Sequence, residues 1–562
     1  MTASTDTIAL ARTWLEQDPD ADTRAELEPI ITAAESGDTA AIADLDDRFS
    51  TRLEFGTAGL RGELGAGSAR MNRVLVAQAA GGLAAFLVAR GASPLTGEKP
   101  SIVIGYDGRK NSKVFAEDTA EIMAGAGVRT VLLPRMLPTP VLAFAVRFLG
   151  TSAGVMVTAS HNPAADNGYK VYLGDYDHGS QIVPPVDGEI AAQIIAVAAT
   201  DTRELPRSTV YETADETVLD EYVTQTAALA GDVSEAPTFV YTALHGVGWE
   251  TAARVFTEAG LGTPAVVAEQ IEPDAAFPTV AFPNPEEPGA LDLAIAKATE
   301  IGAQLVVAND PDADRLAIAI PTADGSWRRL SGNEVGALLG WAAAERAANG
   351  DNNGTLAASI VSSPALAEIA RKYALDYVDT LTGFKWISRA GGLIYGYEEA
   401  LGYLVDPEKV RDKDGISAAV EFLRLTADLT ADGKTLVDHQ RDFDDKFGAY
   451  ASAQISVRVK DLAEIPRIMD KLRSDRPRAI GTILIDSVDD FAEGFDEFPP
   501  SDILRYHLEG HGRVIVRPSG TEPKLKVYID ASSTDGSAEE RRAAADAAVA
   551  ELEAGMHELL GK

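Results

Sequence analysis

Residues 101–106 read SIVIGY and residues 154–158 read GVMVT, and the helical pattern of Lys113–Gly125 lies between these two apolar runs. Short apolar runs that alternate with helical patterns predict α/β units with mostly parallel sheets. The same alternation of apolar runs and helical patterns begins again at Thr238 and at Thr355. These restarts predict three related α/β domains.

The pattern changes after about residue 451. Ala453–Val459 and Val514–Val516 alternate or are β-branched, and Leu525–Ile529 follows a glycine turn, which predicts an antiparallel sheet in a smaller α+β domain. A chain of 562 residues is too long for one hydrophobic core and favours roughly four domains. The expected fold class is therefore α/β: three related α/β domains with mostly parallel mixed sheets, plus a C-terminal α+β domain. Because no low-complexity linker separates them, we expect the domains to lie around a central cleft.

Composition excludes several classes of function. Acidic residues outnumber basic ones by 86 to 50, which gives a formal net charge of −36, so neither nucleic acid nor an anionic membrane is an expected partner. The chain has no cysteine, which excludes disulfides, thiolate catalysis and cysteine–zinc sites. Met1–Asp20 do not resemble a secretion signal, and Val74–Ala89 predicts a buried helix. We therefore expect a cytoplasmic protein.

The first candidate site is the run TASHNP at residues 158–163, directly after the predicted strand GVMV. A turn at the end of a strand places Ser160 at the carboxyl edge of a sheet, where α/β proteins carry their sites. A serine needs activation to act as a nucleophile, and His161 and Lys170 are close in sequence. Taken alone, the motif is equally consistent with a surface Asn-Pro turn.

The second candidate is DPDADR at residues 310–315, after the apolar run QLVVA. Asp310, Asp312 and Asp314 occupy alternate positions, so in an extended segment their carboxylates share one side. Three converging carboxylates favour a hard divalent cation such as Mg²⁺ or Ca²⁺. The alternative is a solvated acidic turn; an EF-hand is disfavoured because its glycine and its later glutamate are missing.

Two further motifs could bind a phosphorylated ligand. RPSGTEP at residues 517–523 combines Arg517 with hydroxyls and a glycine turn, which suits a phosphate cradle, although a hairpin turn explains it as well. GYEEALG at residues 396–402 places adjacent carboxylates on a glycine-bounded loop, where they can accept hydrogen bonds from neighbouring sugar hydroxyls. By itself this second motif is more typical of a solvated helix start.

Together the four motifs resemble those of the α-D-phosphohexomutase superfamily of phosphoglucomutases and phosphomannomutases. The resemblance extends from about Phe55 to Asp530 and includes FGTAGLRG at 55–62, GYDGRK at 105–110, DNGYK at 166–170 and TGFK at 382–385. It points to the long-form subgroup that also contains phosphopentomutases. Many members have serine where this chain has Ala400, which leaves the sugar preference open.

The resemblance implies specific roles. Ser160 would carry a phosphoryl group and, with the aspartates, bind one Mg²⁺ per chain, and glucose 1,6-bisphosphate would be the activator and intermediate. The implied catalytic residues are Ser160, His161, Lys170 and Arg61, and the implied metal ligands are Ser160, Asp310, Asp312 and Asp314. The implied substrate-binding residues are Arg315, Gly383, Lys385, Glu398, Ala400, Arg517, Ser519, Gly520 and Thr521.

The resemblance also implies a domain plan. We expect a helical extension over residues 1–50 packed on the first domain, a phosphoserine domain (51–208), a metal-binding domain (209–324), a sugar-binding domain (325–448) and a C-terminal phosphate-binding domain (449–562). The implied reaction interconverts hexose 1-phosphate and hexose 6-phosphate, with glucose favoured over mannose. The alternatives are a phosphopentomutase, a phosphoserine-forming phosphatase and a non-catalytic sugar-phosphate-binding protein. The expected partners are small sugar phosphates, and the expected state is a monomer or homodimer.

Overall fold

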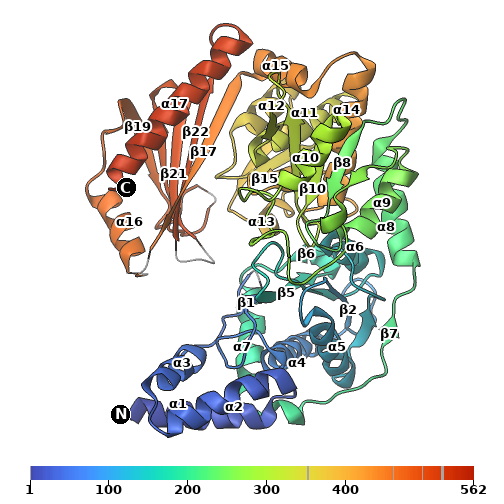
Figure 1. Ribbon diagram of the computed structural model, residues 1–562, viewed down its shortest axis with the longest axis vertical. Coiled ribbons are helices and arrows are strands. Elements are labelled where there is room, and N and C mark those ends of the chain that lie inside the picture. The colour runs from blue at the N-terminus through green and yellow to red at the C-terminus, as the bar shows by residue number, and fades with distance from the viewer. Residues whose placement is uncertain are drawn as a thin grey trace. The chain divides into compact units, whose positions relative to one another are not determined.

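The computed structural model describes residues 2–57, 59–350, 353–459, 461, 463–496, 498–519 and 524–561. The chain forms two compact units, one comprising Met1–Arg329 and Gly402–Ala427 and the other Leu330–Leu401 and Asp428–Lys562. Each unit contains two sheets (Figure 1).

Three helices begin the first unit: α1 (Thr2–Gln17), α2 (Ala21–Glu35) and α3 (Thr39–Phe49). Trp14, Leu27 and Phe49 from these helices share a buried apolar core with Val74 of helix α4 (Arg73–Arg90). The sequence of α4 is long and apolar enough to cross a membrane, but 72% of it is buried inside the protein. The prediction of a buried helix here is confirmed.

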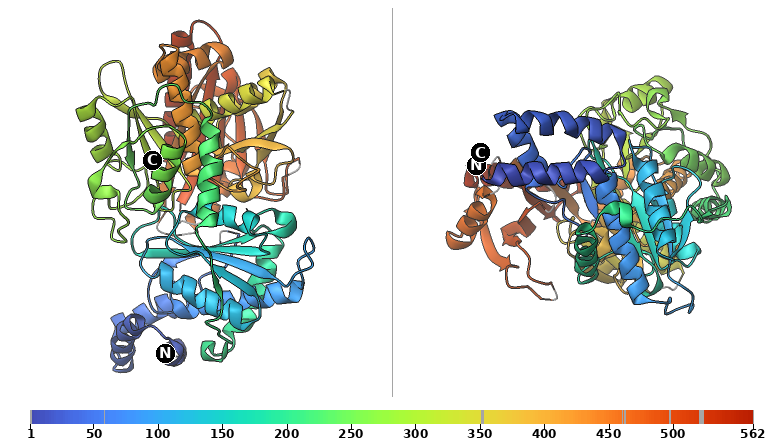
Figure 2. Two further views of the ribbon diagram at one scale, coloured as in Figure 1. Left: turned by 90° about the vertical axis from the view of Figure 1, so that its right-hand side faces the viewer. Right: turned by 90° about the horizontal axis from the view of Figure 1, so that it is seen from below.

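The first sheet has the order β1-β5-β4-β2-β3-β7, with β6 beside β5. The strands are β1 (Leu60–Glu63), β2 (Ser101–Tyr106), β3 (Arg129–Leu132), β4 (Ala153–Val157), β5 (Asp166–Leu173), β6 (Ser180–Gln181) and β7 (Glu212–Thr213). Strands β4, β2, β3 and β7 are parallel, whereas β5 pairs antiparallel with β4, β1 and β6. Helices α4, α5 (Ser112–Gly125) and α7 (Val186–Ala198) lie below this sheet in Figure 1, and α6 (Thr139–Phe148) lies above it. Figure 2 shows the same layers from the side.

The second sheet of this unit has the order β12-β11-β10-β8-β9. Its strands are β8 (Phe239–Thr242), β9 (Ala265–Val266), β10 (Leu305–Asn309), β11 (Leu316–Pro321) and β12 (Trp327–Arg329). Strands β9, β8 and β10 are parallel, and β11 and β12 are antiparallel additions. The unit also contains α8 (Thr217–Ala227), α9 (Gly248–Glu258), α10 (Asp292–Ile301), β16 (Gly402–Leu404) and most of α14 (Gly415–Ala431).

The second unit also contains two sheets of different kinds. Strands β14 (Asp376–Thr380), β13 (Thr355–Ser359) and β15 (Leu393–Glu398) are parallel, and they are accompanied by α11 (Gly332–Asn349), α12 (Ala365–Tyr373), α13 (Phe384–Ile387) and α15 (Leu436–Phe447). The C-terminal sheet is antiparallel, in the order β17 (Ala449–Arg458), β22 (Lys524–Ser533), β21 (Gly512–Pro518), β20 (Leu504–Leu508), β19 (Ile483–Asp490) and β18 (Ala479–Ile480). Helices α16 (Glu464–Ser474) and α17 (Ala538–Leu559) complete it.

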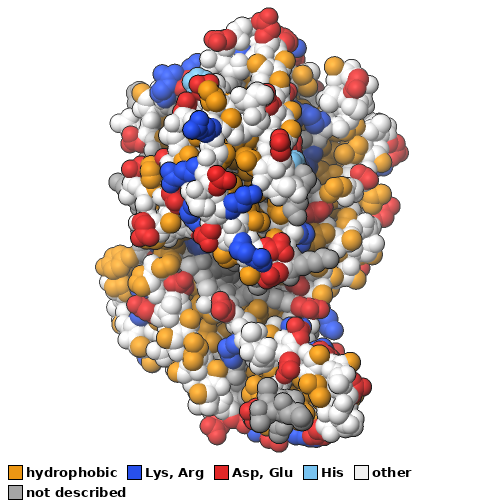
Figure 3. Space-filling view, turned by 90° about the vertical axis from the view of Figure 1, so that its left-hand side faces the viewer, with side chains coloured by type: hydrophobic (Ala, Val, Ile, Leu, Met, Phe, Trp, Pro, Cys, Tyr) orange, Lys and Arg blue, Asp and Glu red, His pale blue; other side chains and the backbone are white. Residues whose placement is uncertain are grey.

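The predicted fold class is confirmed: three α/β sheets that are parallel or mixed precede an α+β domain with an antiparallel sheet. The central cleft stays a prediction. On the face shown in Figure 3, acidic side chains are scattered among basic and apolar ones and form no single patch.

Candidate active site

Ser160 lies three residues beyond the end of strand β4 and is buried. Its backbone is left-handed, with φ of +54°, a strained conformation for a residue with a Cβ atom and one that is concentrated at functional sites. The Ser160 amide donates a hydrogen bond to Thr158 Oγ1 at 2.9 Å, and the Ser160 hydroxyl donates one to Asp310 Oδ2 at 2.9 Å. The nucleophile candidate therefore points at the acidic loop of the second sheet.

Asp310, Asp312 and Asp314 follow strand β10 and are fully buried. Their ligand oxygens lie within 4.8 Å of one another. The loop itself is a turn, with Ala313 left-handed at φ +56°, so the extended segment expected from the alternating spacing is wrong. The convergence of the three carboxylates is confirmed, because the turn brings them together instead.

The charges on this trio are strongly coupled. Burial raises the pKa of Asp310, as do Asp312 and Asp314. Burial would also raise the pKa values of the other two carboxyls, but Lys170 offsets it and holds the pKa of both Asp312 and Asp314 below the usual range. The Lys170 ammonium therefore partly neutralises Asp312 and Asp314, and a bound cation would stabilise the trio further.

The residues present fit a divalent metal ion. Asp312 and Asp314 each use Oδ2 to accept a hydrogen bond from Lys170, whereas their buried Oδ1 atoms accept none within the described part of the chain. Each carboxylate thus offers one oxygen, and buried acceptors of this kind require a partner. Carboxylate oxygens around one point are the donor set preferred by Mg²⁺.

Strand pairing places the basic residues beside the trio. Lys170 in β5 lies 2.8 Å from both Asp312 Oδ2 and Asp314 Oδ2, and β1 next to it carries Arg61, whose Nη1 donates to Asn162 Oδ1 at 3.3 Å. Arg315 Nε lies 3.8 Å from carboxylate oxygens of Asp310 and Asp314. Basic side chains thus gather beside the trio although the chain as a whole is strongly acidic.

His161 Nδ1 lies 3.2 Å from the Ser160 hydroxyl oxygen. Burial, with Arg315 and Arg61 nearby, lowers the pKa of His161 well below its usual value, so the imidazole is neutral at pH 7. A neutral imidazole at this distance can accept or return a proton at the serine oxygen.

Two residues at this site were not predicted. Lys413, between β16 and α14, places Nζ 3.4 Å from Asp314 Oδ2. Thr139, the first residue of α6, donates its hydroxyl to Asp312 Oδ2 at 2.6 Å and its amide to the Asp312 carbonyl at 2.9 Å. The available signal for Lys413 was its run, RDKDG at residues 411–415, which alternates charges between apolar segments.

The second unit carries the predicted sugar and phosphate residues. Glu398 ends strand β15, and Arg517 lies near the end of β21. Both lie near Tyr528: burial and then Glu399 raise the pKa of this tyrosine, with Glu398 adding to the shift, and a hydrogen bond with Arg517 lowers it. The unit therefore brings the carboxylate loop and the basic end of β21 close together.

Further predicted substrate residues belong to the same unit. Gly383 has φ of +108° and precedes α13, which contains Lys385. Ala400 follows β15, and Ser519 follows β21. Gly520 and Thr521 lie outside the described residues.

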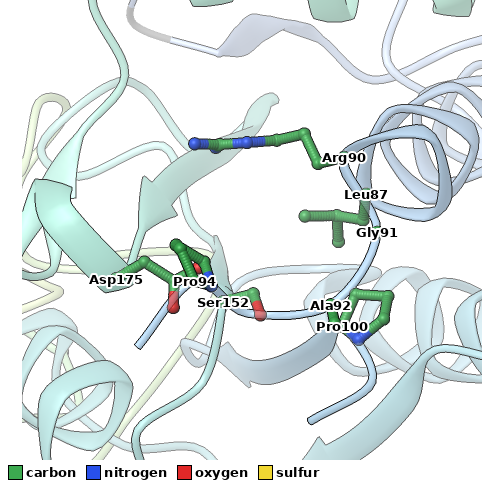
Figure 4. Close-up of a pocket in the computed structure, with 8 residues that line it drawn as sticks. All are labelled: Leu87, Arg90, Gly91, Ala92, Pro94, Pro100, Ser152 and Asp175. Atoms are coloured by element: carbon green, nitrogen blue, oxygen red, sulfur yellow. The ribbon is translucent and has the colours of Figure 1, made fainter. Parts of the chain in front are cut away.

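A separate pocket opens at the end of helix α4. Figure 4 shows Arg90 and Leu87 on one side and Asp175 and Pro94 on the other, with Ser152 between them. None of the predicted site residues lines it. The pocket is therefore distinct from the candidate site around Ser160.

A buried serine hydroxyl beside three convergent carboxylates on α/β sheets is typical of an enzyme for group transfer. Family descriptions for phosphoglucomutase/phosphomannomutase match along the chain: α/β/α domains I, II and III at residues 52–201, 220–325 and 331–444, and the C-terminal domain at 455–548. The chain belongs to this family. It is a phosphosugar mutase, an isomerase that moves a phosphoryl group.

Several relatives span almost the whole chain. A "probable phosphomannomutase" of Haemophilus influenzae is 55% identical and covers 87% of this chain and 98% of its own length. A "probable phosphoribomutase" of Schizosaccharomyces pombe is 37% identical, covering 92% of both chains, and a phosphoglucomutase of Staphylococcus haemolyticus is 34% identical, covering 86% of this chain and 90% of its own. A crystal structure of a phosphoglucomutase/phosphomannomutase family protein from Burkholderia thailandensis shares the fold, with a TM-score of 0.67 at 23% identity over 91% of this chain and 97% of its own.

Proposed function

We propose that this enzyme interconverts hexose 1-phosphate and hexose 6-phosphate, with glucose favoured and mannose also accepted, by carrying the phosphoryl group on Ser160. The observation that carries the proposal is the 2.9 Å contact between the Ser160 hydroxyl and Asp310 within the buried carboxylate trio. A nucleophile beside a cation site suits phosphoryl transfer, which depends on positioning and on charge neutralisation.

The proposed cycle has two transfers. In the first, a free hydroxyl of the sugar monophosphate attacks the phosphorus, a new P–O bond forms, and the bond between phosphorus and Ser160 Oγ breaks. The product is a bound hexose 1,6-bisphosphate, and glucose 1,6-bisphosphate added from solution would enter the cycle at this point. In the second transfer, the other phosphate returns to Ser160 and restores the phosphoenzyme.

Each transfer moves one proton between the sugar hydroxyl and Ser160 Oγ. Lys170 is one candidate acceptor, but its two carboxylate contacts outweigh burial and raise its pKa, so it stays an ammonium. We assign Lys170 to charge neutralisation. His161 is neutral and lies 3.2 Å from Ser160 Oγ, so it suits the role of proton carrier better than Lys170 does.

The proposed metal is one Mg²⁺, held by Asp310, Asp312, Asp314 and Ser160. When bound, the ion would neutralise negative charge on the transferring phosphoryl group. Arg61 and Arg315 add positive charge from the protein. Within the described residues, the Asp trio is the only cluster of three or more side chains that could hold a metal ion. One such cluster supports a mutase with one metal ion over a phosphatase of the two-metal type.

Phosphopentomutase is the second candidate. It is favoured by Ala400, which lacks the serine hydroxyl found in many family members, and by a relative named as a phosphoribomutase at 37% identity. Glu398 and Arg517 are the residues proposed to contact the sugar hydroxyls and the distal phosphate.

Coupled assays on glucose 1-phosphate, mannose 1-phosphate and ribose 1-phosphate, each with a trace of the bisphosphate, test the proposal. We expect Ser160→Ala to lose nearly all turnover, and intact mass to show a phosphoryl group on the wild type that this variant lacks. Near-normal turnover of Ser160→Ala would exclude Ser160 as the carrier. Release of inorganic phosphate in place of isomerisation would indicate a phosphatase.

A further inference from the structure

Arg109 follows strand β2 in the run GYDGRK and is almost completely buried. Its guanidinium donates four hydrogen bonds, all to main-chain carbonyls of the loop that carries the nucleophile. The acceptors are Ser160 O at 2.6 Å, Asn162 O at 2.6 Å, Pro163 O at 2.8 Å and Asp166 O at 3.1 Å.

These four bonds gather the carbonyls of a turn that has little regular structure. The main-chain bonds inside the turn are Asn162 N to Ala159 O and Asp166 N to Pro163 O. Carbonyl dipoles that point toward one another repel unless a donor lies between them, and buried carbonyls require partners. The guanidinium supplies these donors next to Ser160, whose left-handed backbone (φ +54°) must be held by its surroundings.

The guanidinium is itself fixed on two sides. Arg109 Nε lies 3.5 Å from Asp107 Oδ2, and Asp107 Oδ1 accepts the hydroxyl of Ser112 at 2.6 Å. The ring centroid of Phe277 lies 5.0 Å from the guanidinium carbon. Phe277 is located between β9 and α10, in the part of the chain that forms the second sheet. Cation–π contact of this kind is typical of arginine against an aromatic face.

We propose that Arg109 is a positioning residue for phosphoryl transfer: it holds the Ser160 loop in the one conformation that aims the hydroxyl at Asp310. The proposal rests on the proposed function of Ser160 as the phosphoryl carrier. Lysine cannot replace Arg109, because an ammonium has three donors on one atom and cannot reach four carbonyls arranged around a planar fork.

The test compares Arg109→Lys and Arg109→Ala with the wild type. The readouts are kcat and KM for glucose 1-phosphate and the rate at which glucose 1,6-bisphosphate phosphorylates Ser160, followed by intact mass. We expect kcat and the phosphorylation rate to fall about 100-fold, the effect of a small misplacement of a reacting group, while KM stays near its wild-type value. We also expect millimolar guanidinium to restore part of the kcat of Arg109→Ala.

Arg73→Lys is the matched control, because Arg73 is a mostly buried arginine of the same domain that binds Asp118 through two donors. It should behave like the wild type. Phe277→Leu removes the covering ring but leaves the four carbonyl bonds, and it should lower kcat by a smaller factor; it also tests the proposal if Arg109→Ala does not fold.

Wild-type kcat and phosphorylation rate in Arg109→Lys, or a rise in KM alone, would overturn the positioning role. So would a folded Arg109→Ala enzyme that guanidinium does not rescue. Failure of the proposed function is distinguishable, since the wild type itself would then carry no phosphoryl group on Ser160.

Discussion

The Ser160 hydroxyl donates a hydrogen bond to Asp310, 150 positions further along the chain, across 2.9 Å. The two residues follow central strands of different sheets, β4 and β10. The contact joins the proposed phosphoryl carrier to the proposed metal site. Its geometry depends on residues that hold each loop, and these can be tested one at a time.

Thr139→Val should weaken metal binding. The variant removes the 2.6 Å hydrogen bond to Asp312 Oδ2, and loss of a residue that orients a metal ligand commonly costs about 10- to 100-fold in affinity. Calorimetric titration with Mg²⁺ measures the change. Thr119→Val is the control, since Thr119 is equally buried and its hydroxyl donates to the Phe115 carbonyl of its own helix. Equal affinities in the two variants would contradict the prediction.

Lys170→Met should destabilise the metal-free protein by about 3–5 kcal/mol, the usual cost of leaving a buried charge without its partner. Asp312 would then lose its ammonium partner, and Asp314 would keep only the more distant charges of Lys413 and Arg315. Thermal unfolding measures the loss, and saturating Mg²⁺ should recover part of it. Lys297→Met, which removes only an exposed ion pair with Glu300, should change the stability little. If Mg²⁺ recovered none of the stability lost in Lys170→Met, the result would argue against a cation site at the trio.

His161→Gln should lower kcat by about 10²- to 10⁴-fold, the range typical of a lost proton-transfer group. Glutamine keeps a polar atom near Ser160 but cannot exchange a proton at neutral pH. Steady-state assays on glucose 1-phosphate measure the effect. A change confined to KM would instead assign His161 to substrate binding.

The second unit should lose stability in mild acid through His439. Its ring stacks on Trp341 at 4.4 Å, and burial lowers the pKa of His439 to about 4. As the pH falls, the unfolded chain, with a histidine pKa of about 6.5, binds the proton before the folded protein does. The contribution of His439 to the free energy of unfolding is therefore fully present above pH 6.5 and is lost as the pH falls toward 4. The full loss is about 3 kcal/mol.

His439→Phe should remove this pH-dependent contribution to the free energy of unfolding, while a ring still stacks on Trp341. Urea unfolding at pH 7 and at pH 4.5, monitored by tryptophan fluorescence, compares the variant with the wild type. Equal pH dependence in both proteins would show that His439 does not contribute to the acid sensitivity.

Ala400→Ser should shift the sugar preference toward hexoses. A new hydroxyl beside the Glu398 loop would add one hydrogen bond, worth about 1 kcal/mol or roughly a fivefold change in kcat/KM. The measured quantity is the ratio of kcat/KM for glucose 1-phosphate to that for ribose 1-phosphate. An unchanged ratio would place residue 400 outside the sugar-binding surface.

The strands that carry the site could be predicted because their signals are local. SIVIGY became β2 (Ser101–Tyr106), and the run GVMVT became β4 (Ala153–Val157) with its boundary moved by one residue. The acidic loop was predicted for the wrong reason: alternate spacing suggested an extended segment, but the turn at Ala313 brings the carboxylates together. Spacing alone cannot distinguish these two ways of converging.

The sequence by itself determined which chemical groups this protein has and on which turns they lie, since hydrophobic periodicity and turn residues act over a few positions. Only the tertiary structure decided which groups meet. Lys170 lies between Asp312 and Asp314, Lys413 reaches Asp314, and Arg109 holds the Ser160 loop. These contacts depend on strand register and on packing between segments far apart in the chain, and no local pattern encodes such distances.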